Sequence, residues 1–315
     1  MTSSAWSRIV VVGAGAIGSY FGAALAKAGA SVTLIGRERH VEAINREGLM
    51  LLTQSGTERI ALRATADVAA VGAADLVLFC VKSLDTGETA RQMAPHLRRD
   101  AVVLSLQNGV DNVERIRLHV RNRVFPVLVY IGANIPAPGQ VKHTAGNRIV
   151  IGDPDKPGDA DGKGLLDRIV ALFSAAGISA QISSDIETDL WTKLVMNAAY
   201  NVISALSGAQ YGQMAAVPEV RAIMRATVDE VAQVARAKGI RLPDDIADVA
   251  MAFAGTMPTT QSSTAQDFAK GRATEVDHLN GYVAREGEAL GIATPVNRTL
   301  TALMKLFERL KLERA

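Results

Sequence analysis

Short apolar runs alternate with stretches of helically spaced apolar residues through the first part of the chain. Runs this continuous are typical of parallel strands that are covered on both faces. Because helical stretches separate the runs, the pattern predicts an α/β fold with a doubly wound parallel sheet. The main strands are expected at 8–12, 31–35, 75–81, 101–106, 124–133 and 178–182.

Smaller elements are expected around this sheet. A stretch rich in Gly, Asp and Pro at 152–164 predicts an exposed loop. Helices are expected at 16–28, 39–46, 84–95 and 164–176. Short strands are expected at 49–52 and 58–63 around a turn at Gly56, and an antiparallel pair at 140–143 and 148–151.

The pattern changes near Ser183. The residues from Ser184 to Glu187 match a capping box, in which two side chains satisfy the first N–H groups of a helix. From there to the C-terminus we find no clear strand signal, and Pro and Gly residues divide a series of helices. We therefore expect two rigidly packed domains, 1–184 with the sheet and an all-helical 185–315, with ligands in the cleft between them.

A glycine-rich turn follows the first strand without a gap. Gly13 permits a tight turn, Gly15 lets the backbone approach a pyrophosphate, and Gly18 lets the next helix pack closely on the strand. The free N–H groups where this helix starts, at Ala16 and Ile17, then face the phosphates. Strand, glycine turn, helix and second strand in this order predict a Rossmann-type dinucleotide-binding unit.

The end of the second strand bears on the choice of cofactor. NAD-specific proteins usually carry Asp or Glu there, which accepts hydrogen bonds from the ribose 2′-OH. This chain has Gly36 and Arg37 instead. A guanidinium can form paired, charge-assisted hydrogen bonds with a 2′-phosphate, so the sequence predicts NADPH/NADP+. A solvated surface arginine is the alternative interpretation.

Composition narrows the class of protein. A formal net charge of +2 and an aromatic content of 4% give no reason to expect a nucleic-acid or membrane partner. No apolar run has membrane-spanning length, and the first residues lack the features of a signal peptide. The single cysteine, Cys80, excludes an internal disulfide, and five scattered histidines predict no metal site. We expect a cytoplasmic enzyme.

Two polar residues follow buried strands. Lys82 comes after the strand at 75–81, and Asn108 comes after the strand at 101–106. Because the carboxyl ends of parallel strands share one edge of the sheet, both are expected beside the glycine turn. Each alone is better explained as an ordinary loop residue, but two polar residues at the same edge, next to a predicted cofactor, favour a functional role.

A polar stripe marks a helix of the second domain. Lys193, Asn197 and Asn201 stand four residues apart, so they share one helical face, and the residues between them are mainly apolar. Partial burial lowers the pKa of a lysine, which suits proton donation near neutral pH. A solvent-facing stripe, or asparagines that join helices, explains the pattern equally well.

A third polar group follows later in the chain. Ser262 and Ser263 precede one expected helix, and Thr274, Glu275 and Asp277 precede the next. Serine and threonine are common helix caps, and an acidic residue in a first turn interacts favourably with the helix dipole. Capping alone therefore explains these residues, and composition does not exclude it.

These motifs together form an ordered set. They are Gly13-x-Gly15-x-x-Gly18, Arg37, Cys-Val-Lys82-Ser, Gln-Asn108-Gly109, Trp-x-Lys193-Leu-x-x-Asn197-x-x-x-Asn201, Ser262-Ser263-x-x-Gln-Asp267 and Thr-Glu275-Val-Asp277. Their order and approximate spacing resemble the ketopantoate reductase (2-dehydropantoate 2-reductase) family, up to Thr294-Pro295-x-Asn297 and thus over nearly the whole chain. The resemblance implies a Rossmann domain, a helical C-terminal domain and an active site between them. It also implies NADPH-dependent reduction of 2-dehydropantoate to (R)-pantoate, a step towards coenzyme A.

The resemblance also implies roles for single residues. Lys193 looks like the catalytic lysine that hydrogen-bonds the ketone oxygen and supplies the proton, and Glu275 looks like the active-site glutamate that contacts substrate and lysine. Ser263 resembles the serine that binds the substrate carboxylate, and Asn197 and Asn201 resemble the asparagines that line the substrate pocket. The resemblance implies that the cofactor binds to Gly13, Gly15, Ala16, Ile17 and Gly18. Arg37 and Lys82 would contact its 2′-phosphate, and Asn108 would contact cofactor or substrate.

Two positions depart from the family pattern. Tyr211 stands where some members have the asparagine of an Asn-Gly pair, and Thr260 stands where some have a substrate-binding asparagine. Both positions concern the substrate, so a related NADPH-dependent reductase of another 2-keto acid is the alternative.

Two further questions stay open in the sequence. A non-catalytic NADP(H)-sensing protein would need the glycine turn and Arg37, but not Lys193 with Glu275. Arginines and leucines on the C-terminal helices suit a homodimer interface and equally suit an ordinary helix surface.

Overall fold

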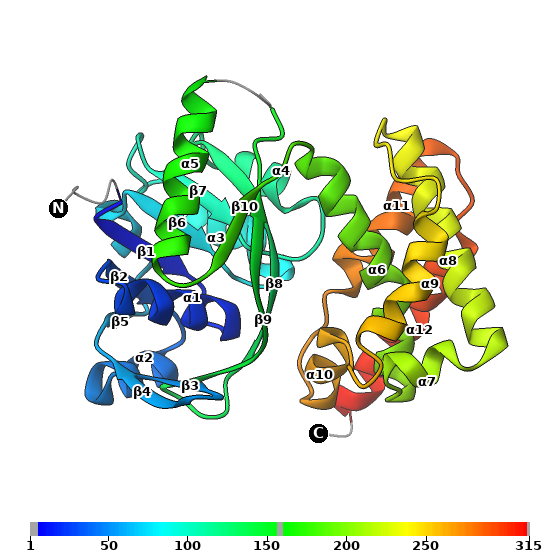
Figure 1. Cartoon of the computed structure of the whole chain (residues 1–315), viewed down its shortest axis with the longest axis horizontal. Helices are drawn as coiled ribbons and strands as arrows, with labels where there is room; N and C mark the ends of the chain where they lie inside the picture. The colour runs from blue at the N-terminus through cyan, green and yellow to red at the C-terminus, as the bar shows by residue number, and fades with distance from the viewer. Residues whose placement is uncertain (1–5, 156–159, 314–315) are drawn as a thin grey trace. The chain divides into compact units, whose positions relative to one another are not determined.

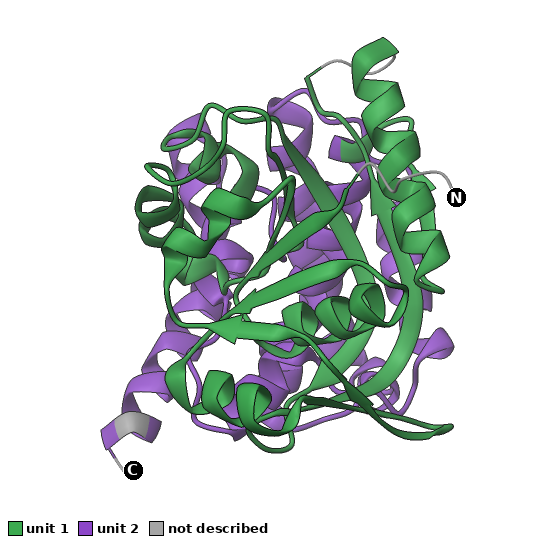
Figure 2. Cartoon of the chain, turned by 90° about the vertical axis from the view of Figure 1, so that its left-hand side faces the viewer, with its two compact units in different colours: residues 1–107, 111–186 green, residues 108–110, 187–315 purple. Residues whose placement is uncertain are grey.

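The computed structural model describes residues 6–155 and 160–313. The chain divides into two compact units, which Figure 2 shows in separate colours. Unit 1 contains the residues up to 107 and 111–186, and unit 2 contains 108–110 and the residues from 187 onwards. The expected boundary at residue 184, and the cofactor and substrate roles of the two parts, stay predictions.

Unit 1 is built on a ten-stranded sheet (Figure 1). The strand order is β4-β3-β9-β8-β7-β6-β1-β2-β5, and β10 pairs with β9 beside this path. The strands from β5 to β8 in this order are mutually parallel, which confirms the doubly wound α/β fold. After β1 and β2 the chain forms β3 and β4 at the far end of the sheet, adds β5 beside β2, and then returns to β6 on the other side of β1. The carboxyl ends of β1 and β6 therefore form the switch point where such sheets bind ligands.

Strand bounds agree with the main apolar runs of the sequence. The strands are β1 (Arg8–Val12), β2 (Ser31–Ile35), β3 (Leu49–Thr53), β4 (Gly56–Ile60), β5 (Arg63–Thr65), β6 (Leu76–Phe79), β7 (Val102–Ser105), β8 (Val124–Asn134), β9 (Gln140–Ile151) and β10 (Ser179–Ile182). The four residues of β6 and the four of β7 are all buried, as expected for central strands with both faces covered.

Helices cover both faces of the sheet. Apolar side chains of α1, α2 and α5 pack with one set of strand residues, and those of α3, α4 and the 3-10 helix η1 pack with the alternate set. Successive side chains of β1 point to opposite faces of the sheet. Ile9 and Val11 belong to the core on one face, and Val10 and Val12 belong to the core on the other. The bounds are α1 (Ala16–Lys27), α2 (Glu38–Glu47), η1 (Val68–Ala73), η2 (Ser83–Asp85), α3 (Thr86–Met93), α4 (Asn112–Arg117) and α5 (Ala160–Ala175).

The expected antiparallel pair at 140–143 and 148–151 was wrong. These residues form one strand, β9, which runs antiparallel to β8. Gly146, between the two expected strands, has a φ of 69° within β9, and the register with β8 shifts between Tyr130 and Ala133. The glycine therefore builds a β-bulge, where a Cβ would lie 2.1 Å from the Tyr130 carbonyl oxygen.

Two smaller expectations also need correction. The strand expected at 58–63 is split, because β4 ends at Ile60 and β5 begins at Arg63 and pairs with β2. The loop expected at 152–164 is shorter than predicted, since α5 begins at Ala160, while residues 156–159 lie outside the described residues. Gly162 lies in the first turn of α5, and a Cβ there would lie 3.0 Å from side-chain atoms of both Arg123 and Asp153.

Unit 2 is helical, and its described residues contain no strand. Helix α6 lies in its middle, since one side packs with α7, α8, α9 and α11 and the other packs with α10 and α12. The amide of Asn280 donates to the Ala198 carbonyl (3.0 Å) and to Asn297 Oδ1 (3.0 Å), which anchors α6 internally. The bounds are α6 (Ile186–Ser207), α7 (Tyr211–Ala215), α8 (Pro218–Ala237), α9 (Ile246–Thr256), α10 (Ser263–Ala269), η3 (Val276–His278), α11 (Asn280–Leu290) and α12 (Pro295–Glu313).

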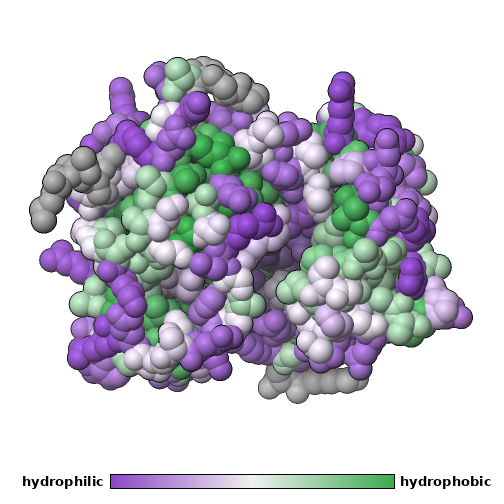
Figure 3. Space-filling model, viewed as in Figure 1, coloured by the Kyte–Doolittle hydropathy of each residue, from purple (hydrophilic) through white to green (hydrophobic). Residues whose placement is uncertain are grey.

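The surface carries apolar residues in patches separated by polar ones on the face that Figure 3 shows. Within 6–155 and 160–313, no helix combines the length and the apolar character that crossing a membrane requires.

Candidate active site

The glycine turn lies at the carboxyl end of β1. The N–H groups of Gly13 and Ala14 both donate to the Ile35 carbonyl, at 3.0 and 2.8 Å, so the turn bends back over β2. Gly13 has a φ of 103°, and a Cβ there would lie 2.7 Å from the Val81 backbone nitrogen. A Cβ on Gly18 would lie 2.1 Å from the Gly13 carbonyl oxygen. Both positions therefore require glycine for packing within the protein.

Gly15 differs from these two glycines. No atom lies within 4 Å of the place where its Cβ would stand, so the protein itself leaves room for a side chain. Gly15 is also the N-cap of α1 and provides no side-chain cap to the first N–H groups. An open, uncapped helix start fits a dinucleotide phosphate, which the sequence predicted at this turn.

Two basic residues follow the strands on either side of β1. Arg37 ends the segment after β2, is exposed, and makes no side-chain hydrogen bond or ion pair with another described residue. Lys82 follows β6, is exposed, and is the N-cap of η2. The sheet thus places both predicted 2′-phosphate residues at the carboxyl edge that carries the glycine turn.

In unit 2, a lysine, a glutamate and an asparagine come together. Lys193 lies half-buried on α6, and Glu275 is buried directly before η3. The Asn108 amide donates to Glu275 Oε2 at 3.2 Å, although 167 positions separate the two residues in sequence. Three of the residues that the sequence singled out are therefore joined by hydrogen bonding or by charge.

The electrostatics of this group suit a proton donor. Burial lowers the pKa of Lys193 to about 8, and the negative charge of Glu275 acts in the opposite direction and limits the fall. A lysine with this pKa is mostly protonated at neutral pH and gives up its proton far more readily than an ordinary lysine.

Asn197 and Asn201 follow Lys193 along the same face of α6. Asn197 is half-buried and Asn201 is buried, and neither side-chain amide is hydrogen-bonded to another part of the described chain. The interpretation that they tie helices together is therefore not supported, and both amides have bonding capacity for a ligand.

Ser262 and Ser263, from the third polar group of the sequence, have different roles. Ser262 is buried and caps α10, because its hydroxyl accepts from the Ala265 N–H (3.0 Å) and donates to the Asn201 carbonyl (3.1 Å). Ser263 is the first residue of α10 and is exposed. The capping interpretation thus accounts for Ser262 and leaves the Ser263 hydroxyl for another role.

Tyr211 and Thr260, the two positions that depart from the family pattern, are neighbours in the structure. The Tyr211 N–H donates to the Thr260 carbonyl at 3.0 Å. The Tyr211 ring is buried against Tyr200, with ring centroids 4.7 Å apart, and against Phe253 at 6.0 Å. Burial raises the pKa of Tyr211 to about 12. A backbone hydrogen bond therefore connects this aromatic cluster to the segment that leads to Ser263.

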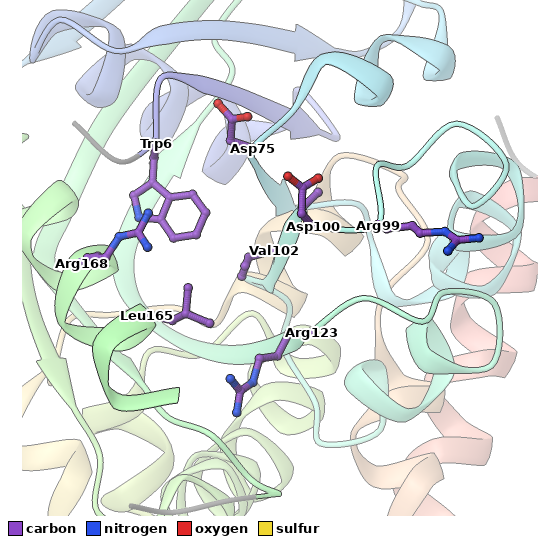
Figure 4. A pocket seen from close by; sticks show the side chains of 9 residues that line it. Trp6, Asp75, Arg99, Asp100, Val102, Arg123, Leu165 and Arg168 are labelled. Carbon is purple, nitrogen blue, oxygen red and sulfur yellow. The ribbon is translucent and has the colours of Figure 1, made fainter. Parts of the chain in front are cut away.

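A hollow of about 300 Å³ lies at the opposite edge of the sheet (Figure 4). Its walls come from the amino ends of parallel strands, including Asp75 and Val102, and from α5. The Arg168 guanidinium lies over the Trp6 ring at 4.7 Å, while Arg99 and Arg123 point away from that ring. This hollow contains none of the predicted site residues, and we assign it no catalytic role.

A buried polar network around Gln107 was not predicted. The sequence drew attention to the neighbouring Asn108, but hydrogen bonds between distant residues leave no periodic signal.

Among residues 6–155 and 160–313, no group of three or more His, Cys, Asp and Glu side chains is arranged to hold a metal ion.

Comparison with protein families matches both parts of the chain. Residues 9–156 match the family described as ketopantoate reductase PanE/ApbA, and residues 185–308 match the family described as ketopantoate reductase PanE/ApbA C terminal. A protein named 2-dehydropantoate 2-reductase from Halobacterium salinarum is 32% identical over 305 residues, covering 96% of this chain and 99% of that protein.

Solved structures agree with this similarity. The structure of a PanE/ApbA family ketopantoate reductase from Ralstonia eutropha has a TM-score of 0.90 and 44% identity, covering 97% of this chain and 99% of its own. A D-mandelate dehydrogenase, in a ternary structure with NADH and anilino(oxo)acetate, has a TM-score of 0.89 and 25% identity, covering 96% and 99%.

Proposed function

Because this chain belongs to the ketopantoate reductase family, we propose that it reduces the ketone of a 2-keto acid with NADPH and that 2-dehydropantoate is its substrate. The product would be (R)-pantoate, an intermediate on the route to coenzyme A. Members of this family are nicotinamide-dependent oxidoreductases. The observation that carries the proposal is the combination of Lys193, with its pKa of about 8, and the Glu275 carboxylate that Asn108 holds.

The cofactor-binding residues fit a dinucleotide with an extra phosphate. The N–H groups of Ala16 and Ile17 and the open space at Gly15 would receive the pyrophosphate. Arg37 and Lys82 would pair with the 2′-phosphate, which favours NADPH over NADH. The reduced nicotinamide supplies the hydride when it is bound.

Lys193 would act as the proton donor. Its ammonium group would hydrogen-bond the ketone oxygen, where negative charge develops as C2 accepts the hydride. The ammonium proton then passes to that oxygen, which leaves a neutral alcohol and a neutral lysine amine. Solvent returns the proton to Lys193, so each turnover consumes one NADPH and one proton.

The neighbouring residues would orient the substrate. Glu275 is buried and held by Asn108, so its charge stays close to Lys193 and limits the loss of the ammonium proton. The Ser263 hydroxyl would bind the substrate carboxylate, and the amides of Asn197 and Asn201 would bind its remaining polar atoms. These assignments rest on the resemblance and on the bonding capacity of these side chains.

A second substrate class is favoured by one specific observation. Tyr211 and Thr260 replace two positions where some family members carry asparagine, and Tyr211 belongs to an aromatic cluster with Tyr200 and Phe253. The similar D-mandelate dehydrogenase structure contains anilino(oxo)acetate, an aromatic 2-oxo acid derivative. A 2-keto acid with an aromatic side chain, such as phenylglyoxylate, is therefore the alternative substrate.

A substrate panel tests the proposal. The initial rate of NADPH oxidation is measured with 2-dehydropantoate, phenylglyoxylate and small branched 2-keto acids, and each assay is repeated with NADH. We expect the highest kcat/KM with 2-dehydropantoate and NADPH. A clear preference for phenylglyoxylate would replace the substrate and keep the reaction, whereas no turnover of any 2-keto acid would refute the function.

A further inference from the structure

A network of buried polar side chains surrounds the loop that carries Lys82. Five of its members are almost fully excluded from solvent, although each brings polar atoms that must be satisfied. They come from η2, from the end of β7 and the segment that follows it, and from the starts of α3 and α4. The members are Ser83 and Thr86 (both 0% exposed), Ser105 and Asn112 (both 3%) and Gln107 (8%).

Gln107 is the centre of this network. Its Nε2 donates to the Val81 carbonyl at 3.0 Å and to Thr86 Oγ1 at 2.7 Å. Its Oε1 accepts from the Ser105 hydroxyl at 3.0 Å. A single side chain therefore joins the end of β7 to the loop after β6, at Val81, and to the first residue of α3.

The network continues to the other side of Lys82. The Thr86 hydroxyl donates to Asn112 Oδ1 at 2.9 Å, and Asn112 Nδ2 donates to Ser83 Oγ at 3.2 Å. Arg115 also donates to the Ser83 carbonyl at 2.6 Å. The residues before and after Lys82 are thus both fixed by buried or partly buried hydrogen bonds, while the lysine side chain itself is exposed.

We propose that Gln107 is a positioning residue that holds the Lys82 loop so that the lysine meets the cofactor 2′-phosphate. The inference rests on the proposed NADPH-binding function of Lys82. A long, flexible lysine makes a useful contact only when its backbone is fixed, because ordering it otherwise costs side-chain and backbone entropy. Gln107 touches neither the cofactor nor the substrate in this role, and it acts only through Lys82.

The test compares the affinities for NADPH and NADH. In Gln107→Leu, the side-chain volume is similar but all three hydrogen bonds are lost. We expect the Kd for NADPH to rise roughly five- to tenfold, as for the loss of one charge-assisted contact, and the Kd for NADH to change less than about twofold. In a Lys82→Ala background, Gln107→Leu should have no further effect on the NADPH/NADH ratio.

A matched control removes a similar amide at the other end of β7. Asn122 Nδ2 donates to the carbonyls of Arg98 (2.7 Å) and Ala101 (2.8 Å), at the amino end of that strand. Asn122→Leu should leave both cofactor affinities unchanged. If Gln107→Leu does not fold, Thr86→Val replaces it, because it keeps the shape and loses the hydroxyl, while Thr86→Ser restores the hydroxyl and the NADPH preference.

Each outcome decides the proposal. An equal loss of NADPH and NADH affinity, or a Gln107 effect that persists without Lys82, would overturn the positioning role. A wild-type protein that binds both cofactors equally would contradict the proposed NADPH preference itself, and the role of Gln107 at the 2′-phosphate would fall with it.

Discussion

The pH dependence of the reaction should follow the protonation of Lys193. Burial lowers its pKa to about 8, and Glu275 is the charge that keeps it from falling further. In the proposed mechanism reduction needs the protonated amine, so activity should be high below this pKa and should fall as the pH rises through it. With a pKa of about 8, the protonated fraction falls from about nine-tenths at pH 7 to about one-tenth at pH 9.

The assay is kcat/KM for the keto acid at saturating NADPH across this pH range. We expect a decrease of about tenfold between pH 7 and pH 9, whereas an unperturbed lysine would lose less than about a tenth of its protonated form. Glu275→Gln removes the attractive charge, so the alkaline limb should move below pH 8. Lys193→Arg keeps a permanent charge, so a slower enzyme without this limb is expected.

Two results would refute this reasoning. A wild-type profile that stays flat up to pH 9 would mean that the proton donor has an unperturbed pKa or that proton transfer does not limit the rate. A limb that remains near pH 8 in Lys193→Arg would assign the titration to another group.

Four further variants test the structure of unit 1. Arg37→Ala should raise the Kd for NADPH about tenfold and leave that for NADH nearly unchanged, because only NADPH carries the 2′-phosphate; equal effects on both would contradict the assignment. Gly18→Ala should lower the stability by more than about 2 kcal/mol, since its Cβ would lie 2.1 Å from the Gly13 carbonyl oxygen. Gly15→Ala should fold normally and lose cofactor affinity, and thermal melting with cofactor titration separates the two variants. Asp75, whose pKa is lowered to about 2 mainly by its hydrogen bond with Arg8, should contribute stability above about pH 4 that is lost as the pH falls towards 2. After allowance for solvent screening the contribution is about 1 kcal/mol, and Asp75→Asn should remove that acid dependence from urea unfolding curves.

Much of the fold was predictable because the central strands are covered on both faces. The runs at β1, β6 and β7 had to be apolar on both sides, so their positions were readable, and their bounds differ from the expected ones by no more than two residues. The course of β9 was not readable, because Gly146 marks a bulge or a reversal equally well in sequence. Only the pairing with β8 decides between the two.

The candidate site was partly predictable for a similar reason. Helical spacing placed Lys193, Asn197 and Asn201 on one face of α6. No sequence pattern reveals that Asn108 reaches Glu275, 167 positions away, since that contact depends on the folded chain. Only the structure shows that Ser262, and not Ser263, caps α10, because either serine is a suitable helix cap in sequence.

The most direct test of the account compares the wild-type protein with Lys193→Ala. NADPH oxidation is measured with 2-dehydropantoate for both, and NADPH affinity is measured separately by titration. The account predicts turnover by the wild type, a decrease in kcat of about 100- to 10,000-fold in the variant, and an unchanged NADPH affinity. Undiminished turnover by Lys193→Ala would contradict the proposed proton donor, and the absence of wild-type turnover with any 2-keto acid would contradict the function itself.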